Sequence, residues 1–470
     1  MSDSLVFKSI RQLGGLVRAR EVSPTDLAEV FLNRLERLGP EYNAVVTVTR
    51  DRALREARRA EEEISSGRYR GPLHGIPYGV KDLLATKDGI PTTWGAAPFR
   101  EQVFDYDATV VERLGAAGAV LAAKLAMVEL AGGGGYWQPN ASFTGPGITP
   151  WDKRRWSGGS STGSGAATGA GLVPFAIGSE TGGSIMSPSS NCGVAGLRPT
   201  YGRVSRYGAM ALSWTLDKLG PMCLTADDCG LVLEAISGRD PKDPTTTRRS
   251  FVYDDSDVGS RRFRFGVMEN VTDHVDEPTR TNFERALGVL DRVADIEEMR
   301  FSDLPHDEIL QVILFAEAAS AFEDIVDSGK LADMTAPEDR FGAYPRVTVL
   351  AKDYINALRL RRLVAENAEE VMSPFDALVA PTRSGVATPV DQGFRSATLH
   401  GGKDTMMSLG NVAGLPAVSV PSGFSEEGLP TGIKFMGRAY GENAILAAAR
   451  AYQSLTDWHE RHPPDLLPAE

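Results

Sequence analysis

Two serines stand in the same glycine-rich setting and could do nucleophilic chemistry. Ser160 and Ser184 each end a Gly-Gly-Ser tripeptide, and these tripeptides bound a stretch of 27 residues with nine glycines and five serines. So many glycines let the backbone approach another group closely. A serine on a glycine turn is exposed enough to attack a carbonyl, and backbone N–H groups beside it can hold an oxyanion. The stretch therefore indicates acyl chemistry at a serine.

Two other interpretations of this stretch fit the sequence less well. Flexible linkers are rich in glycine and serine, but here the apolar run GLVPFAIG lies in the middle and predicts a buried strand. The segment from Gly178 to Ser184 is similar to a phosphate-binding loop, but Ser184 stands where that loop needs a lysine. We therefore expect neither a linker nor a nucleotide site.

A serine nucleophile needs a base, which is usually a histidine. None of the six histidines sits in a strong local motif; they are His74, His274, His306, His400, His459 and His462. The apolar run LHGIPYGVKDLLA, in contrast, contains Lys81. This lysine either lies at a strand end with its amine reaching solvent, or is desolvated, with a lowered pKa that lets it act as a base. The sequence leaves both alternatives open.

The composition argues against several other classes of protein. A net charge of −12 over 470 residues does not suit a nucleic-acid partner. No His, Cys or carboxylate cluster has metal-ligand spacing, and Cys192, Cys223 and Cys229 are expected to be reduced core thiols. The N-terminus has no signal pattern, and no apolar run reaches the roughly 18 residues of a membrane span. We expect a cytoplasmic protein that needs no metal or cofactor.

The elements that must position these residues alternate between helices and strands. Residues 4–65 are expected to be helical, with a helix start at SPTD, residues 23–26. Strands are expected in AVLAAKLA, FRFGVM, FDALVAP and GLPAVSVP, and helices at 226–236, 278–293, most of 306–372, and 441–457. This alternation is typical of an α/β fold.

Several motifs together resemble the amidase signature family. They are GVKD at 79–82, GGSS at 158–161, GSETGGSIMSP at 178–188, CGVAGLRPTYGRVSRYG at 192–208, FDALVAPT at 375–382 and NVAGLPAVSVP at 411–421. The resemblance covers nearly the whole chain and implies one large α/β/α domain around a mixed, twisted sheet. It further implies an N-terminal helical arm at 1–65 and an amidase signature domain at 66–470, most variable at about 240–370.

The resemblance also implies roles for individual residues. Ser184 matches the family's nucleophile, Ser160 its cis-serine and Lys81 its lysine. Ser184 would attack a carbonyl while Ser160 takes its proton and passes it to neutral Lys81. Water would then hydrolyse the acyl-enzyme. The oxyanion would be held by the backbone N–H groups of Thr181, Gly182, Gly183 and Ser184.

The sequence departs from the family's pattern at positions that bear on the substrate. Glu180 replaces the usual Asp, Met186 the usual Arg, Thr162 a Gly, and Lys124-Leu125-Ala126 lacks the usual Thr-Asn. An arginine at position 186 would favour substrates with a carboxylate, so its absence favours neutral, apolar or aryl amides, with esters and carbamates as further substrates. The expected substrate-binding residues are Gly134, Trp137, Met186 and Asp404.

Two alternatives to a stand-alone amidase remain. Residues 192–221 resemble the glutaminase subunit of a tRNA-dependent amidotransferase, and Asp404 matches that subunit's glutamine-binding Asp. The segment 316–330, however, lacks the subunit's Arg-Phe-Asp-Gly-x-Arg pattern. The other alternative is a non-catalytic binding scaffold, which the intact Lys81, Ser160 and Ser184 argue against. The expected partners are a small amide and water, without nucleic acid or membrane, and a homodimer is allowed for.

Overall fold

Three apolar strands form the middle of the fold and carry the candidate lysine and the start of the nucleophile's turn. β2 (Pro77–Lys81), β3 (Val120–Leu125) and β4 (Phe175–Glu180) are buried at every residue. Continuous apolar runs are typical of strands that are covered on both faces. β2 runs parallel to both β3 and β4, so the carboxyl ends of these strands lie at one edge. In α/β sheets this edge is where ligands bind.

The computed structural model describes residues 3–134, 137–256, 261–341, 348–394 and 405–467, and within them eleven strands form one mixed sheet. The strand order is β1-β3-β2-β4-β6-β5-β10-β11-β9-β7-β8. The further strands are β1 (Val45–Val48), β5 (Ala195–Arg198), β6 (Lys218–Cys223), β7 (Phe263–Met268), β8 (Ala294–Met299), β9 (Ala377–Pro381), β10 (Ala417–Phe424) and β11 (Pro430–Met436).

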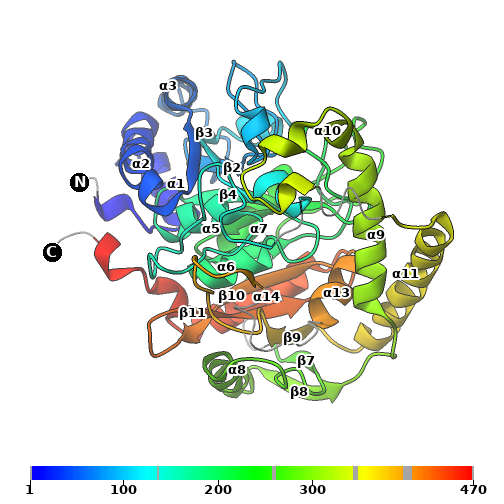
Figure 1. Ribbon diagram of the computed structural model, residues 1–470. Helices are drawn as coiled ribbons and strands as arrows, with labels where there is room; N and C mark the ends of the chain where they lie inside the picture. The colour runs from blue at the N-terminus through cyan, green and yellow to red at the C-terminus, as the bar shows by residue number, and fades with distance from the viewer. Residues whose placement is uncertain (1–2, 135–136, 257–260, 342–347, 395–404, 468–470) are drawn as a thin grey trace.

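Helices cover both faces of this sheet (Figure 1). One face packs mainly against α1 (Ile10–Ala19), α4 (Thr109–Ala116), α7 (Ala226–Ile236), α8 (Glu277–Leu290) and α14 (Glu442–Ser454). The other packs mainly against α2 (Pro24–Leu38), α3 (Arg50–Ser65), α5 (Thr162–Gly169), α6 (Met186–Cys192), α9 (His306–Ala321), α11 (Ala351–Met372) and α13 (Thr405–Val412). The expected α/β/α domain around a mixed sheet is confirmed.

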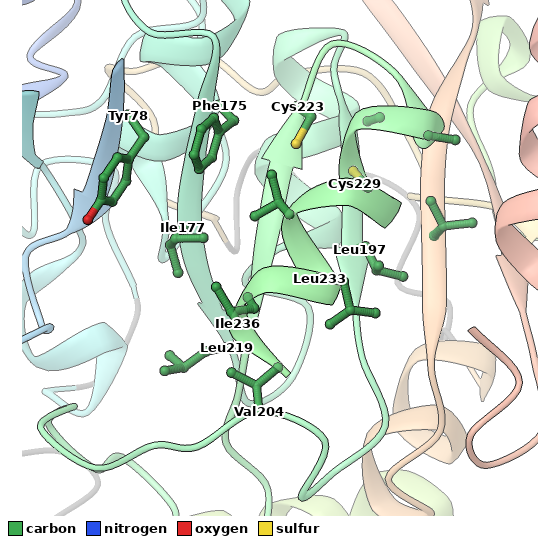
Figure 2. Close-up of a cluster of buried hydrophobic side chains, with 14 of the residues drawn as sticks. Tyr78, Phe175, Ile177, Leu197, Val204, Leu219, Cys223, Cys229, Leu233 and Ile236 are labelled. Carbon is green, nitrogen blue, oxygen red and sulfur yellow. The ribbon is translucent and has the colours of Figure 1, made fainter. Parts of the chain in front are cut away.

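The two faces of β4 show why helices are needed on both sides. Figure 2 shows Phe175 and Ile177 in one apolar cluster with Leu233 and Ile236 of α7. Ala176, between them, belongs to the cluster on the opposite face. Successive side chains of a strand point to opposite faces, so an all-apolar strand is stable only between two layers.

The N-terminal 65 residues differ from the purely helical arm that the sequence predicts. Between α2 and α3 the chain forms β1, which pairs antiparallel with β3 at one end of the sheet. α2 contributes to the apolar clusters on both faces of the sheet, with Leu27 and Phe31 in one and Leu32 and Leu35 in the other. Residues 240–370 contain β7, β8, α8, α9, the short α10 (Glu323–Asp327) and most of α11.

The cysteines, the apolar helices and the possible metal ligands can each be described for the residues that the structure covers. All three cysteines are buried and unpaired, and burial raises the pKa of the Cys192 thiol. Among the described residues, no helix has the length and apolar character needed to cross a membrane. The described side chains also form no cluster of three or more His, Cys, Asp or Glu that could hold a metal ion.

Candidate active site

The catalytic candidate lysine ends β2 and is buried against two hydroxyls. Lys81 is fully buried, and its Nζ lies 2.7 Å from Ser160 Oγ and 2.8 Å from Ser179 Oγ. Ser160 directly precedes the turn into α5 and follows a cis peptide bond from Gly159. Ser179 belongs to β4, the strand next to β2. The sheet thus brings together two residues of the predicted triad and one hydroxyl, Ser179, that was not predicted.

The electrostatic surroundings of Lys81 favour its neutral form. Burial lowers the pKa of Lys81 because a charged amine loses its hydration inside the protein. The negative charges of Asp217 and Glu180 oppose this effect only in part, and the resulting pKa is about 7. A substantial fraction of Lys81 is therefore an unprotonated amine at neutral pH, as a base requires. Of the two alternatives that the sequence left open, an amine reaching solvent is ruled out, because the side chain of Lys81 is fully buried.

The proposed nucleophile lies in the turn between β4 and α6, which Glu180 holds in place. Glu180 is fully buried, and its Oε2 accepts the backbone N–H groups of Ile185 (2.8 Å) and Met186 (3.0 Å). A carboxylate at a helix N-terminus satisfies N–H groups that have no partner in the helix. The carboxylate thereby anchors both ends of the turn that carries Ser184.

A second contact keeps Glu180 charged. Its Oε1 lies 2.8 Å from a guanidinium nitrogen of Arg198, which is also fully buried. Burial alone would raise the pKa of Glu180, but Arg198 and Lys218 outweigh it, so the pKa falls to about 2. The residue that replaces the family's usual Asp is therefore an ionised cap beneath the nucleophile.

The turn itself opens onto a cavity of about 350 Å³. Ser184 is half-buried there, and Thr181, Gly182 and Gly183 line the same cavity. In the described part of the chain, the backbone N–H groups of Gly182, Gly183 and Ser184 donate to no protein acceptor. Gly183 has a φ of +108°, which a side chain would strain. Unpaired N–H groups beside a serine form the arrangement that an oxyanion needs.

Thr181 is held by a buried carboxylate. Its Oγ1 donates to Asp217 Oδ1 at 2.6 Å, while the backbone N–H groups of Leu212 (2.9 Å) and Ser213 (3.0 Å) donate to Asp217 Oδ2. Burial raises the pKa of Asp217. Asp217 thus ties the segment 212–217, whose Leu212 lines the cavity, to the start of the nucleophile's turn.

Comparisons with known proteins agree with this geometry. The amidase family model matches residues 26–446. The chain belongs to the amidase signature family. Its similar relatives include a subunit of the glutamyl-tRNA(Gln) amidotransferase of Chloroflexus aurantiacus, 36% identical over 95% of this chain and 96% of that one. The putative amidase AmiD of Mycobacterium tuberculosis is 34% identical over 98% of this chain and 97% of that one.

Solved structures lead to the same family. The peptide amidase from Stenotrophomonas maltophilia is 31% identical and matches this fold with a TM-score of 0.84 over 97% of this chain and 98% of that one. Amidase signature enzymes hydrolyse amides, so the expectation of an amidase-type enzyme acting on C–N bonds is confirmed.

The four predicted substrate-binding residues of this amidase lie in different places relative to the cavity. Met186 lines the cavity, as expected. Gly134 and Trp137 are not among the described residues that line it, and a Cβ on Gly134 would lie 2.5 Å from Cγ of Asp339. Gly134 therefore packs against the short 3-10 helix Asp339–Phe341. Asp404 lies outside the described residues.

A cationic side chain lines the cavity although residue 186 is a methionine. The family's usual arginine is replaced by Met186, but Arg383, from the segment after β9, lines the same cavity. Its guanidinium donates to Ser187 Oγ in the first turn of α6. Arg383 directly follows the FDALVAPT motif, and no spacing in the sequence links it to Ser184. The chain supplies a cation from a distant segment.

The unusual Lys124 has a structural role. It is fully buried on β3, and its Nζ lies 3.0 Å from Asp82 Oδ1, 2.6 Å from Thr92 Oγ1 and 2.7 Å from the Leu84 carbonyl oxygen. Asp82 follows Lys81 directly. The contacts of Lys124 therefore hold the chain in place directly after Lys81.

Proposed function

We propose that this protein hydrolyses carboxylic amides through an acyl-enzyme on Ser184, with Ser160 and Lys81 completing the triad. The observation that carries the proposal is the fully buried Lys81, whose amine lies 2.7 Å from Ser160 and has a pKa of about 7. A hydroxyl next to a neutral amine in a dry site is a route for removing a proton from a serine nucleophile.

The proposed reaction has two stages, acylation of Ser184 and hydrolysis of the ester. Ser184 Oγ attacks the amide carbon, its proton moves to Ser160 Oγ, and the Ser160 proton moves to the lone pair of Lys81. The carbonyl oxygen becomes an oxyanion that accepts from the N–H groups of the turn, each worth roughly 3 kcal/mol. The proton returns through Ser160 to the nitrogen, and the C–N bond breaks. Water then repeats the attack on the ester and releases the acid.

The cavity wall favours an acyl group with an apolar or aryl body. Six of its lining side chains are large and apolar: Trp156, Met186, Leu212, Leu314, Phe394 and Met407. The rings of Trp156 and Phe394 lie 4.4 Å apart, which provides an aromatic surface. Esters and carbamates present the same carbonyl to Ser184, so we propose them as further substrates.

A chromogenic screen tests this proposal. Anilides, primary amides, aryl esters and aryl carbamates are compared with the wild type and with Ser184→Ala. We expect turnover of amides by the wild type, with a mass increase on Ser184 when an ester accumulates the acyl-enzyme. The proposal fails if the wild type hydrolyses none of these compounds, or if Ser184→Ala retains the activity.

A second candidate function is the glutaminase step of a tRNA-dependent amidotransferase. It is supported by the 36% identity to the Chloroflexus amidotransferase subunit over 95% of this chain. Glutamine is then the amide, and the ammonia released would serve a partner protein. Measuring glutamate release from glutamine alone, and beside the other amides, separates the candidates: a glutaminase prefers glutamine to every aryl amide.

A further inference from the structure

A buried carboxylate outside the proposed triad, Glu317, holds the segment 212–217 beside the active-site cavity. Glu317 lies in α9 and is only 5% exposed. Its Oε2 accepts the backbone N–H of Thr215 (3.0 Å) and the hydroxyl of Ser213, and its Oε1 accepts Thr215 Oγ1 (2.8 Å). These hydrogen bonds compensate the carboxylate for the hydration that it loses on burial. Glu317 therefore fixes the segment at two positions.

Glu317 is itself held from α11, which packs against α9 (Figure 1). The hydroxyl of Tyr354 donates to Glu317 Oε1 at 2.9 Å. Burial and this hydrogen bond raise the pKa of Tyr354 to about 12, so the hydroxyl keeps its proton and remains a donor. Arg361, two turns later in α11, donates to the carbonyl oxygen of Thr215 at 2.7 Å. Both helices thus hold the segment 212–217, although none of the predicted catalytic residues lies in them.

Asp217 connects this segment to the nucleophile's turn. Its carboxylate accepts the hydroxyl of Thr181, the first residue after β4, and the backbone N–H of Ser213. Ser213 is shared by two carboxylates, because its N–H donates to Asp217 and its hydroxyl donates to Glu317. A continuous series of hydrogen bonds therefore runs from α9 to the start of the turn.

Asp217 also acts on the proposed base. Burial lowers the pKa of Lys81, and the charges of Asp217 and Glu180 oppose this effect. The influence of a carboxylate on a nearby amine weakens with distance. A displacement of Asp217 away from Lys81 would therefore lower the pKa of Lys81 further, whereas a loss of stability alone would leave that pKa unchanged.

We propose that Glu317 is a positioning residue for the reaction and that it fixes, through Ser213 and Asp217, the turn that holds the oxyanion. This inference rests on the proposed amide hydrolysis. Backbone donors stabilise an oxyanion most when they are held in place before the charge develops. Glu317 does not line the cavity, so its loss should affect turnover more than substrate binding.

Three substitutions separate the hydrogen bonds of Glu317 from its contribution to stability. Glu317→Ala removes the four hydrogen bonds described above, whereas Glu317→Gln keeps the shape of the side chain. The glutamine oxygen can accept from Ser213 and the N–H of Thr215, and its NH₂ group can donate to the hydroxyls of Thr215 and Tyr354. The control is Ile313→Ala, one turn earlier in α9, because Ile313 is fully buried in the apolar core and its loss destabilises the same helix.

The assay measures kcat, KM and Tm with the anilide or primary amide that the wild type hydrolyses fastest. We expect Glu317→Ala to lower kcat about tenfold, a part of the effect of one oxyanion donor, and to change KM less. Glu317→Gln should stay within about threefold of the wild type. Ile313→Ala should keep the wild-type kcat at a lower Tm. An unchanged kcat in Glu317→Ala, or an equal loss in Ile313→Ala, overturns the inference.

A second variant decides the matter if Glu317→Ala does not fold. Ser213→Ala removes only the hydroxyl that lies between the two carboxylates. It should lower kcat at least about threefold, since the loss of one hydrogen bond to a charged group has at least this effect. A wild-type kcat in Ser213→Ala overturns the inference.

The route through Asp217 has its own test. In an Asp217→Asn background, Glu317→Ala should lower kcat less than about threefold, because residues that act through one another are not additive. In the single variant Glu317→Ala, the acid limb of the kcat/KM profile should move to lower pH by about half a unit. A tenfold loss in both backgrounds, or an unshifted profile, overturns this route and with it the inference.

The proposed function and this inference fail in different ways. A wild type that hydrolyses no amide overturns both. A wild type that hydrolyses amides, with the same kcat in Glu317→Ala, refutes the role of Glu317 alone and leaves amide hydrolysis standing.

Discussion

Replacing Lys81, the proposed base, by methionine should make the protein inactive and, near neutral pH, more stable. Lys81 is fully buried, and its pKa is lowered from 10.5 to about 7, first by burial. Each pKa unit corresponds to 1.36 kcal/mol, so keeping Lys81 in the fold at low pH costs about 5 kcal/mol. Methionine has a similar unbranched shape and no charge. The variant avoids this cost, which raises its free energy of unfolding, but it loses the hydrogen bonds to Ser160 and Ser179, worth about 1 kcal/mol each.

The pH dependence of this gain has a definite sign. Between about pH 7 and 10.5 the unfolded chain binds a proton at Lys81 that the folded protein does not bind. The wild type therefore becomes more stable as the pH rises through this window. Below pH 7 the full cost remains, and Lys81→Met should be more stable than the wild type by about 2–3 kcal/mol. The gain should shrink with rising pH and change sign near about pH 9.

Thermal unfolding at a fixed scan rate, from pH 6 to 10, measures this effect. For a chain of this length 1 kcal/mol shifts Tm by about 1 °C, so we expect Lys81→Met to unfold about 2–3 °C higher than the wild type at pH 7. Lys124→Met is the matched control, since Lys124 is equally buried but paired with Asp82. Leaving Asp82 without its partner should destabilise the protein by about 3–5 kcal/mol.

The comparison of the two variants tests whether Lys81 is neutral in the folded protein. If Lys81→Met unfolds below the wild type at pH 7, by as much as Lys124→Met does, then Lys81 is a charged structural residue. A difference in Tm between Lys81→Met and the wild type that does not vary with pH leads to the same conclusion. Either result removes the neutral amine on which the proposed mechanism depends.

Three further predictions concern the same site. The kcat/KM of the wild type should rise about tenfold per pH unit below pH 7 and level off above it, because Lys81 must be unprotonated; a flat profile from pH 5 to 9 contradicts this. Ser184→Ala should abolish hydrolysis with an unchanged circular dichroism spectrum, and more than a few per cent residual activity would show another nucleophile. Glu180→Gln should lower kcat at least tenfold and Tm by several degrees, since it leaves Arg198 buried without its charge partner; wild-type values for both would mean that the cap is dispensable.

Motifs near one another in the sequence made the centre of the site predictable. Ser160 precedes and Ser184 follows one apolar strand in the sequence. The positions of both serines therefore depend on β4 and the turns next to it. The strands predicted from apolar runs are also found, because strands covered on both faces need apolar residues throughout. The edge strand β1 was missed because it is only four residues long, half-buried, and lies between two strong helix patterns.

Residues that reach the site through the sheet order could not be predicted. Arg383 follows β9, which pairs with β11 and β7 far from β4 in the strand order. Its contact with Ser187 depends on how α6 is oriented on the sheet, and the hydrophobic periodicity of the sequence does not predict that orientation. Asp217 was not among the predicted site residues, because its hydrogen bond to Thr181 depends on the antiparallel pairing of β4 with β6.

Burial alone does not distinguish the catalytic lysine from a structural one. Lys81 and Lys124 lie on neighbouring parallel strands, both in apolar runs and both fully buried. The register pairs Lys124 with Val80 and Lys81 with Leu125, so the two side chains leave the sheet on opposite faces. On one face the Asp82 carboxylate lies 3.0 Å from the amine of Lys124 and opposes the lowering of the Lys124 pKa by burial. On the other, Ser160 and Ser179 offer hydroxyls and no charge, so the amine can lose its proton. The two lysines are offset by one residue in the register of β2 and β3, so they face different partners. We propose that this difference in partners makes Lys81 the base.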